Sequence, residues 1–361
     1  MASTASALIP CGQFKTEYRK DTTIFPTPMS RGFAIAAVLL LCIAPLQIGG
    51  VELLSPYQLN ILIQIGYYGI AALGLNILVG FTGQISLGHA AFFGFGAFAS
   101  AWLNNDFGVP VFWAIPLAGL MTTVVGMLFG IPAARIKGLY LAIATFAAQF
   151  ILEDFFARAD WFTGGSSGTI AQSFSIFGFA ITGDRQYFYV VLAYMVVLFL
   201  LGANLLRSRD GRAFVAVRDH YLSAEIMGIN LTKYRVLSFG VAAFYAGVGG
   251  ALFGHYLSFV SAESFTILLS IQFLGMIIIG GLGSVMGTLM GTAFMVLLPE
   301  VVQAFSQTAG NVFPALTDGI AFLKEGAIGL AIVLFLIFEP DGLAHRWKMI
   351  KAYWKLYPFS Y

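Results

Sequence analysis

Residues 207–235 read RSRDGRAFVAVRDHYLSAEIMGINLTKYR and form the one long polar interruption in a strongly apolar sequence. Six of the nineteen basic residues lie in this stretch. Apolar or small residues recur in it at steps of three or four, the spacing of one helix face: Phe214, Val217, Tyr221, Ala224 and Gly228. We expect a short amphipathic helix, with Asp219 as a helix N-cap and Gly228 as a C-terminal stop. Such a helix either lies on lipid headgroups or binds a soluble partner.

The composition around this stretch defines the class of protein. Of 361 residues, 59% are hydrophobic and only 10% are charged, with a mean hydropathy of +0.85. A soluble domain of this length is far more polar, so we predict an all-α polytopic membrane protein. The net charge of +2 does not indicate nucleic-acid binding. Cys11 and Cys42 have neither close spacing nor a histidine neighbour, so they predict no disulfide framework and no metal site.

Ten apolar runs, joined by short and often glycine-rich connections, predict about ten transmembrane helices. The runs are 32–48, 58–81, 86–103, 110–131, 138–156, 187–206, 236–257, 267–282, 284–304 and 319–338. The third, eighth and tenth are short, so eight crossings fit equally well if two segments enter the membrane without crossing. The chain then divides into a tail (1–31), a first membrane block (32–206), the central polar segment (207–235), a second block (236–338) and a second tail (339–361).

The basic residues predict the orientation of these spans. If the N-terminus lies in the cytosol and the spans alternate, 16 of the 19 basic residues fall on the cytosolic side. The exceptions are Arg158, Arg185 and Lys324. Because cytosolic loops of membrane proteins are enriched in Lys and Arg, both termini are expected in the cytosol.

Three stretches carry a resemblance to a known family. The first is AEIMGIN (224–230) with Gly211-Arg212-Ala213 and Arg218-Asp219 upstream; the others are GFTGQISLGHAAF (80–92) and GGLGSVMG (280–287). Together they resemble the M-type permease subunits of bacterial ABC importers for branched-chain amino acids. In that family the central segment docks onto an ATPase subunit. The resemblance therefore implies an ATPase-coupling role for Arg212, Phe214, Arg218, Asp219, Tyr221, Ala224, Glu225 and Gly228. It implies a place in the translocation pathway, or in close helix packing, for Gly83, Gln84, Ser86, His89, Gly283, Ser284 and Gly287.

The resemblance also implies partners. They are a second permease subunit, two ABC ATPase subunits that bind ATP and Mg, and a periplasmic substrate-binding protein, all at a bacterial inner membrane. The chain has no Gly-Lys dipeptide and hence no Walker A loop, so it predicts no nucleotide site, cofactor or catalytic centre of its own. Urea, short amides and aromatic acids remain alternative substrates on the same scaffold.

Two other classes of function compete with this interpretation. An ion-coupled secondary transporter needs titratable groups near the membrane midplane, where the spans offer chiefly amides and hydroxyls. A membrane enzyme needs a nucleophile and base facing one cavity; the GGSSG match to G-x-S-x-G (164–168) lacks the strand and helix that motif requires. His89 is expected to bond a nearby backbone carbonyl. Gly283, Gly287 and Gly291 are expected to form one bare stripe on a helix, and the two glycine-rich stretches hint at an internal repeat.

Overall fold

The computed structural model describes residue 23 and residues 28–48, 51–52, 54–136, 138–176, 179–181, 183–310 and 319–356. The predicted tail 1–31 lies almost wholly outside these residues, as does Lys137. Among the described residues, eight helices are long and apolar enough to cross a membrane. The prediction of an all-α polytopic membrane protein is confirmed.

The eight candidate spans follow the predicted apolar runs closely. They are α3 (Pro56–Asn76, continued by the π-helical turn η1, Ile77–Phe81), α5 (Val111–Ala133), α6 (Leu139–Arg158), α8 (Asp184–Arg207), α11 (Leu231–Leu257), α12 (Ile267–Gly280), α13 (Val285–Gly310) and α15 (Ile320–Phe338). The candidate span that contains α12 begins earlier, at Ala262, because the short turn η3 (Ala262–Ser264) precedes it.

Two predicted runs differ from these eight. The run 32–48 becomes α2 (Pro28–Ile43), whose apolar part, Arg31–Ile43, is shorter than a full span, followed by strand β1 (Gln47–Ile48). The run 86–103 becomes α4 (His89–Phe107), which is long enough but not among the eight. His89 at one end and the polar residues 104–106 at the other lower its hydropathy.

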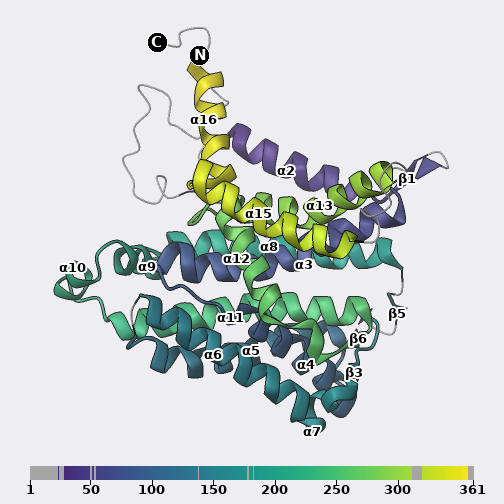
Figure 1. Ribbon diagram of the computed structural model, residues 1–361, viewed down its shortest axis with the longest axis horizontal. Coiled ribbons are helices and arrows are strands. Elements are labelled where there is room, and N and C mark those ends of the chain that lie inside the picture. The colour runs from purple at the N-terminus through teal and green to yellow at the C-terminus, as the bar shows by residue number, and fades with distance from the viewer. Residues whose placement is uncertain are drawn as a thin grey trace.

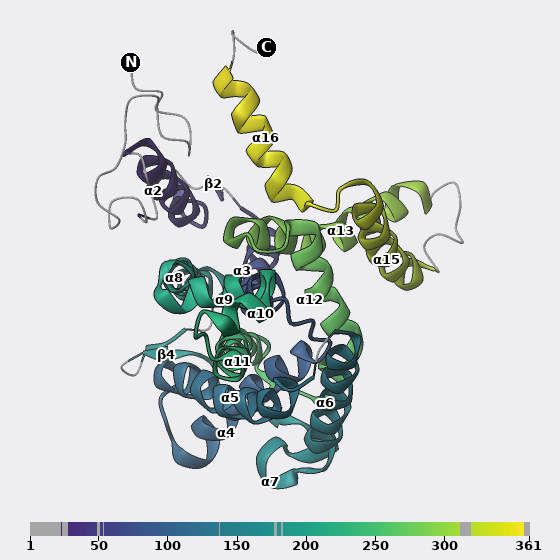
Figure 2. The ribbon, with the colours of Figure 1, turned by 90° about the vertical axis from the view of Figure 1, so that its left-hand side faces the viewer.

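The α4 helix lies in the centre of the bundle, and its first thirteen residues are buried on every face. It packs against α5 and α11, and α11 also packs against α3 and α5 (Figures 1 and 2). A Cβ at Gly250 on α11 would lie 1.8 Å from the carbonyl oxygen of Phe93 on α4, so the two helices meet at backbone contact. Small residues at such crossings bring membrane helices together.

The α3 helix shows how the sequence starts a span. Ser55 is its N-cap, and its hydroxyl accepts a hydrogen bond from the backbone N–H of Gln58 (3.3 Å). The Gln58 side chain in turn accepts the Ser55 N–H at 3.0 Å, completing a capping box. Pro56 occupies the first helical turn, where its missing N–H costs nothing.

The connections gather at two ends of the bundle. At one end lie α9 (Arg209–Asp219) and α10 (Tyr221–Ile226), which we call the coupling arm (left in Figure 1). At the opposite end lie α7 (Asp160–Thr163) and the short strand pairs (Figure 1). The other elements are η2 (Gly165–Ser167), β2 (Val51–Glu52), β3 (Thr169–Ile170), β4 (Ser175–Ile176), β5 (Phe179–Ala180), β6 (Phe259–Val260) and α16 (Gly342–Leu356).

The three strand pairs are β1–β2, β3–β6 and β4–β5, all antiparallel. The β3–β6 pair joins the long loop after α6 to the connection between α11 and α12. In that loop Gly164-Gly165-Ser166-Ser167-Gly168 forms a 3-10 turn after α7, not a strand-to-helix elbow. The prediction that its G-x-S-x-G match is accidental is confirmed.

Candidate functional site

The coupling arm is two helices, where the sequence predicted one. Ser208 caps α9, its hydroxyl accepting from the Gly211 N–H at 3.3 Å. The helix α9 ends before His220, which is the N-cap of α10. The Nδ1 atom of the His220 ring accepts a hydrogen bond from the Ser223 N–H at 3.4 Å. The prediction that Asp219 is the N-cap is wrong. Its carboxylate is held by the Arg218 guanidinium, with Nε 2.8 Å from Oδ1, and does not turn toward the next helix.

Gly228 ends the arm as predicted. It has φ +84°, a left-handed conformation that other residues adopt at a cost. Its N–H donates to the Glu225 carbonyl (2.9 Å), and the Ile229 N–H donates to the Ala224 carbonyl (2.9 Å). This pair of bonds is the Schellman arrangement, which closes a helix and reverses the chain.

The predicted apolar stripe faces the chain's own membrane block. Phe214 is 0% exposed and its ring meets that of Tyr234 edge-on, with centroids 6.1 Å apart. Val217 and Ala224 are also buried, and the Tyr221 ring centroid lies 6.0 Å from the guanidinium carbon of Arg235. Phe214 therefore anchors the arm to the bundle and is not available to a partner.

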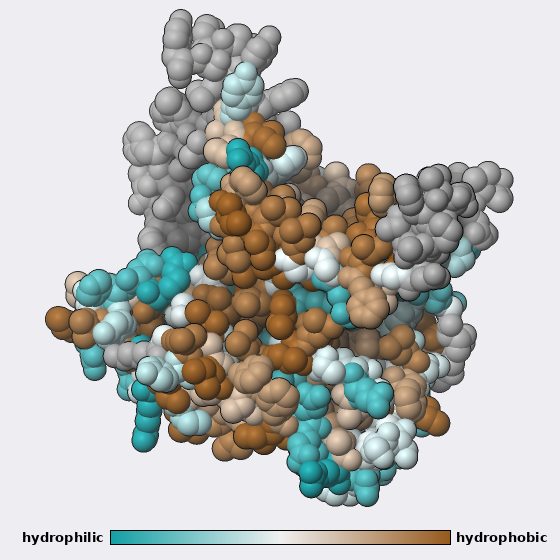
Figure 3. All heavy atoms as spheres, viewed as in Figure 1, coloured by the Kyte–Doolittle hydropathy of each residue, from teal (hydrophilic) through white to brown (hydrophobic). Residues whose placement is uncertain are grey.

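The opposite face of the arm carries the apolar residues that sequence reasoning missed. Leu222, Ile226 and Met227 are 52%, 87% and 84% exposed. Glu225 is exposed beside them, with no side-chain partner among the described residues. Figure 3 shows hydrophobic atoms at the extremity where Figure 1 places α10. Leu222 and Ile226 are four residues apart, a spacing that places both on one helix face and indicates this second apolar face in the sequence.

Arg218 ties the arm to the membrane helices. Its Nη1 donates to the Gly80 carbonyl at 2.7 Å, across 138 residues of sequence. A Cβ at Gly83 would lie 3.0 Å from Arg218 Cγ, and a Cβ at Gly283 would lie 3.3 Å from its Nη1. Arg218 therefore contacts both glycine-rich connections, and its side chain is 37% exposed.

These two connections form one unit, which we call the glycine junction and define by Asn76, Gly80, Gly283, Ser284 and Thr288. The Asn76 amide donates to the Ser284 carbonyl (3.0 Å) and to the Thr288 hydroxyl (2.6 Å), and its Oδ1 accepts the Gly283 N–H (2.9 Å). A Cβ at Gly80 would lie 2.4 Å from Gly283 N. The junction includes Gly80 of η1 and its N-cap Asn76, in a π-helical turn of the kind that often marks functional sites.

The expected stripe of three glycines is only partly present. Gly287 and Gly291 lie on α13, where a Cβ on either would lie within 3 Å of the backbone of Gly280 or its neighbours. Gly283, however, has φ +74° and belongs to the turn before the helix. The reason is its positive φ, which a right-handed helix does not allow, and the Asn76 side chain accepts its N–H in this turn.

The other predicted pathway residues are buried among helices. The Gln84 amide donates to the hydroxyls of Thr82 (3.0 Å) and Ser238 (2.7 Å). Ser86 is 1% exposed and accepts from the Gly88 N–H at 3.5 Å. His89 Nε2 lies 2.8 Å from the Ala71 carbonyl, so the expected bond to a backbone carbonyl is confirmed. All three side chains are buried, and whether they serve the pathway or only helix packing stays a prediction.

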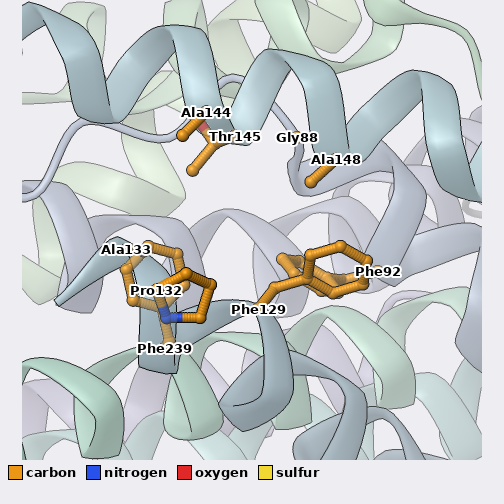
Figure 4. Close-up of a pocket in the computed structure, with 9 residues that line it drawn as sticks. All are labelled: Gly88, Phe92, Phe129, Pro132, Ala133, Ala144, Thr145, Ala148 and Phe239. Atoms are coloured by element: carbon orange, nitrogen blue, oxygen red, sulfur yellow. The ribbon is translucent and has the colours of Figure 1, made fainter. Parts of the chain in front are cut away.

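Two cavities open between the helices. One, of about 60 Å³, lies among α4, α5, α6 and α11 and is almost wholly apolar (Figure 4). Its single polar side chain, Thr145, already bonds the Leu87 N–H (3.0 Å) and the Ala142 carbonyl (3.0 Å). The other, of about 170 Å³, lies among α3, α12, α13 and α15 and has a mixed lining with Gln64, Tyr68, Gln272 and Glu300. Among the described residues, no cluster of three His, Cys, Asp or Glu side chains could hold a metal ion.

Comparison with known proteins identifies the family. A family described as branched-chain amino acid transport system / permease component matches residues 57–324. The chain belongs to this permease family. The matched region contains the whole coupling arm, the glycine junction and every residue of both cavities except Ile328.

Individual members of this permease family include the high-affinity branched-chain amino acid transport system permease proteins LivM of Salmonella typhimurium and Escherichia coli. Each is 31% identical over 301 residues, covering 76% of this chain and 67% of the relative. The probable LivM of Methanocaldococcus jannaschii is 24% identical over 326 residues, covering 78% of this chain and 92% of the relative. No solved structure matches the chain.

Proposed function

We propose that this chain is a permease subunit of an ATP-driven ABC importer and forms, with a second permease, the pathway for branched-chain amino acids. Two ATPase subunits supply ATP and Mg binding, and a periplasmic substrate-binding protein delivers the solute. The proposal rests on membership of the permease family, on relatives that carry branched-chain amino acid permease names, and on the coupling arm.

The single observation that carries the ATPase coupling is the exposed apolar end of the arm. Ile226 and Met227 are more than four-fifths exposed, next to the free carboxylate of Glu225. Exposed apolar side chains with polar residues around them are typical of a protein–protein contact, which has an apolar core and a polar rim. A partner bound at Ile226 acts on α10, which the chain joins to α9 at His220 and which contacts α11 through Tyr221 and Arg235.

The route from the arm to the membrane runs through Arg218. A displacement of α9 pulls on the Gly80 carbonyl and presses on Gly83 and Gly283, where glycines leave no side chain to absorb it. The two connections that meet at the junction run from the ends of α3 and α12 to the starts of α4 and α13. Motion of one residue therefore reaches the turns of two helical hairpins.

The arm faces the cytosol in this proposal, with both chain termini on the same side. The arm and its flanks carry Arg207, Arg209, Arg212, Arg218, Lys233 and Arg235. Basic residues of membrane proteins concentrate on the cytosolic side, so the α7 end faces the periplasm of a bacterial inner membrane and is positioned to meet the binding protein.

Reconstitution tests the proposal. The two permeases and two ATPases are placed in proteoliposomes loaded with ATP and Mg, with the binding protein outside, and uptake of labelled leucine is measured. Uptake is expected only when every component is present, with competition by isoleucine and valine but not by urea, acetamide or benzoate. Uptake that persists without the ATPases contradicts the proposal, and competition by urea alone would reassign the substrate.

A further inference from the structure

The cavity among α3, α12, α13 and α15 has the chemistry of a binding site. Four polar side chains line it: Gln64 and Tyr68 from α3, Gln272 from α12 and Glu300 from α13. Met276, Val296 and Ile328 supply apolar walls. Each polar group comes from a helix that also belongs to a candidate membrane span, where an ionisable residue without a role is expensive.

The polar side of the cavity can receive both a cation and an anion. Glu300 offers a carboxylate, and the Tyr57 hydroxyl hydrogen-bonds it from the start of α3. Met295 and Pro299 of α13 also line the cavity. Because Pro299 has no N–H, the Met295 carbonyl does not receive the hydrogen bond that residue 299 would otherwise donate in the helix. The amides of Gln64 and Gln272 provide N–H donors. Gln64 bonds Asn60 at 2.7 Å, and Gln272 has no side-chain partner among the described residues.

The helix positions of the lining residues place the cavity away from the glycine junction. Gln64 and Tyr68 lie eight and twelve residues beyond the start of α3, or roughly 12 and 18 Å along a helix that rises 1.5 Å per residue. Glu300 lies fifteen residues, roughly 22 Å, beyond the start of α13 at the glycine junction. The cavity therefore extends from near the middle of the bundle toward the end at which α3 begins, where Glu300 bonds the Tyr57 hydroxyl.

Its size and lining select the ligand. A small cavity of about 170 Å³ that combines polar groups with apolar walls suits a small zwitterion with an apolar side chain. From these observations, we propose that this cavity is a transient binding site for an aliphatic α-amino acid. Glu300 and the Met295 carbonyl face its ammonium group, Gln64 and Gln272 face its carboxylate, and the apolar walls face its side chain. This inference rests on the proposed function for its substrate class.

The site is distinct from the coupling route. Neither Arg218 nor any residue of the glycine junction lines this cavity. Substitutions in the cavity are therefore expected to change how much solute moves per ATP without preventing ATP hydrolysis. This separation distinguishes a ligand contact from a residue that merely holds the fold together.

The first test is Glu300→Gln in the full reconstituted transporter, which keeps the shape and removes the charge. A hydrogen bond between charged groups is worth a factor of roughly ten or more, so leucine transported per ATP is expected to fall about tenfold. Hydrolysis stimulated by the binding protein is expected to stay within about twofold of wild type. The control is Glu325→Gln, an exposed carboxylate on α15 that lies outside the cavity and is expected to transport as wild type.

The second test does not depend on transport. Gln272→Cys is introduced after Cys11 and Cys42 are changed to Ser, and labelling by a membrane-impermeant methanethiosulfonate is timed. Millimolar leucine is expected to slow labelling, whereas 4-methylpentanoate, which lacks the amine, is not. If the wild-type transporter moves no leucine, the proposed function fails. The labelling experiment then shows by itself whether the cavity binds leucine. Wild-type transport by Glu300→Gln, or labelling of the Gln272→Cys variant that leucine does not slow, overturns the inference.

Discussion

Arg218→Gln tests the link between the arm and the membrane helices. The change removes the bond from Nη1 to the Gly80 carbonyl (2.7 Å) and the charge that holds Asp219 (2.8 Å). Hydrogen bonds to charged groups contribute about 1.5–3 kcal/mol. Because the Arg218 side chain is 37% exposed, water replaces part of the bond, and we expect a loss near 1 kcal/mol, or about fivefold in an equilibrium.

The expected result is that leucine transported per ATP falls about fivefold while ATP hydrolysis continues. Labelled uptake and phosphate release are measured in the same proteoliposomes. Asp219→Asn is the matched control, because it weakens the neighbouring ion pair but leaves the bond between Arg218 and Gly80 in place. If Arg218→Gln transports the wild-type amount per ATP, or if Asp219→Asn loses as much, the proposed route through Gly80 is refuted.

Two further predictions concern the two faces of the arm. Glu225→Lys reverses an exposed charge without removing an internal contact, so the chain is expected to insert normally while hydrolysis is uncoupled from uptake; unchanged uptake in vesicles would end the case for Glu225. Phe214→Ala removes a fully buried ring and is expected to destabilise the arm by about 3 kcal/mol, seen as a lower Tm in detergent. Leu222→Ala, at a 52% exposed position, is its control, and equal Tm values for the two variants would contradict the assignment of the faces.

The fold followed from the sequence because length and hydropathy act locally. The apolar runs predicted the eight candidate spans to within a few residues at most ends, and Gly228 stopped its helix as expected. His89 also found the backbone carbonyl that a buried ring requires. Each of these depends on the residue itself or on its immediate surroundings.

The errors arose where contacts between side chains, most of them distant in sequence, decide the outcome. Periodicity showed that Phe214 and Val217 share a face, but not that this face packs on the chain's own α11. Asp219 has the side chain of an N-cap, yet Arg218 holds its carboxylate. The bonds from Arg218 to Gly80 and from Asn76 to Ser284 span 138 and 208 residues, so no local pattern predicts them.

The exposed end of the arm gives the most direct test of ATPase coupling. A photoreactive phenylalanine analogue at position 226, which is 87% exposed in the wild-type chain, is activated in intact cells, and the cross-linked partner is identified by mass. An adduct with an ABC ATPase subunit is expected at this position and not at Trp161, which is 68% exposed in α7 at the opposite end. An ATPase adduct at position 161, or none at position 226, would contradict the coupling mechanism.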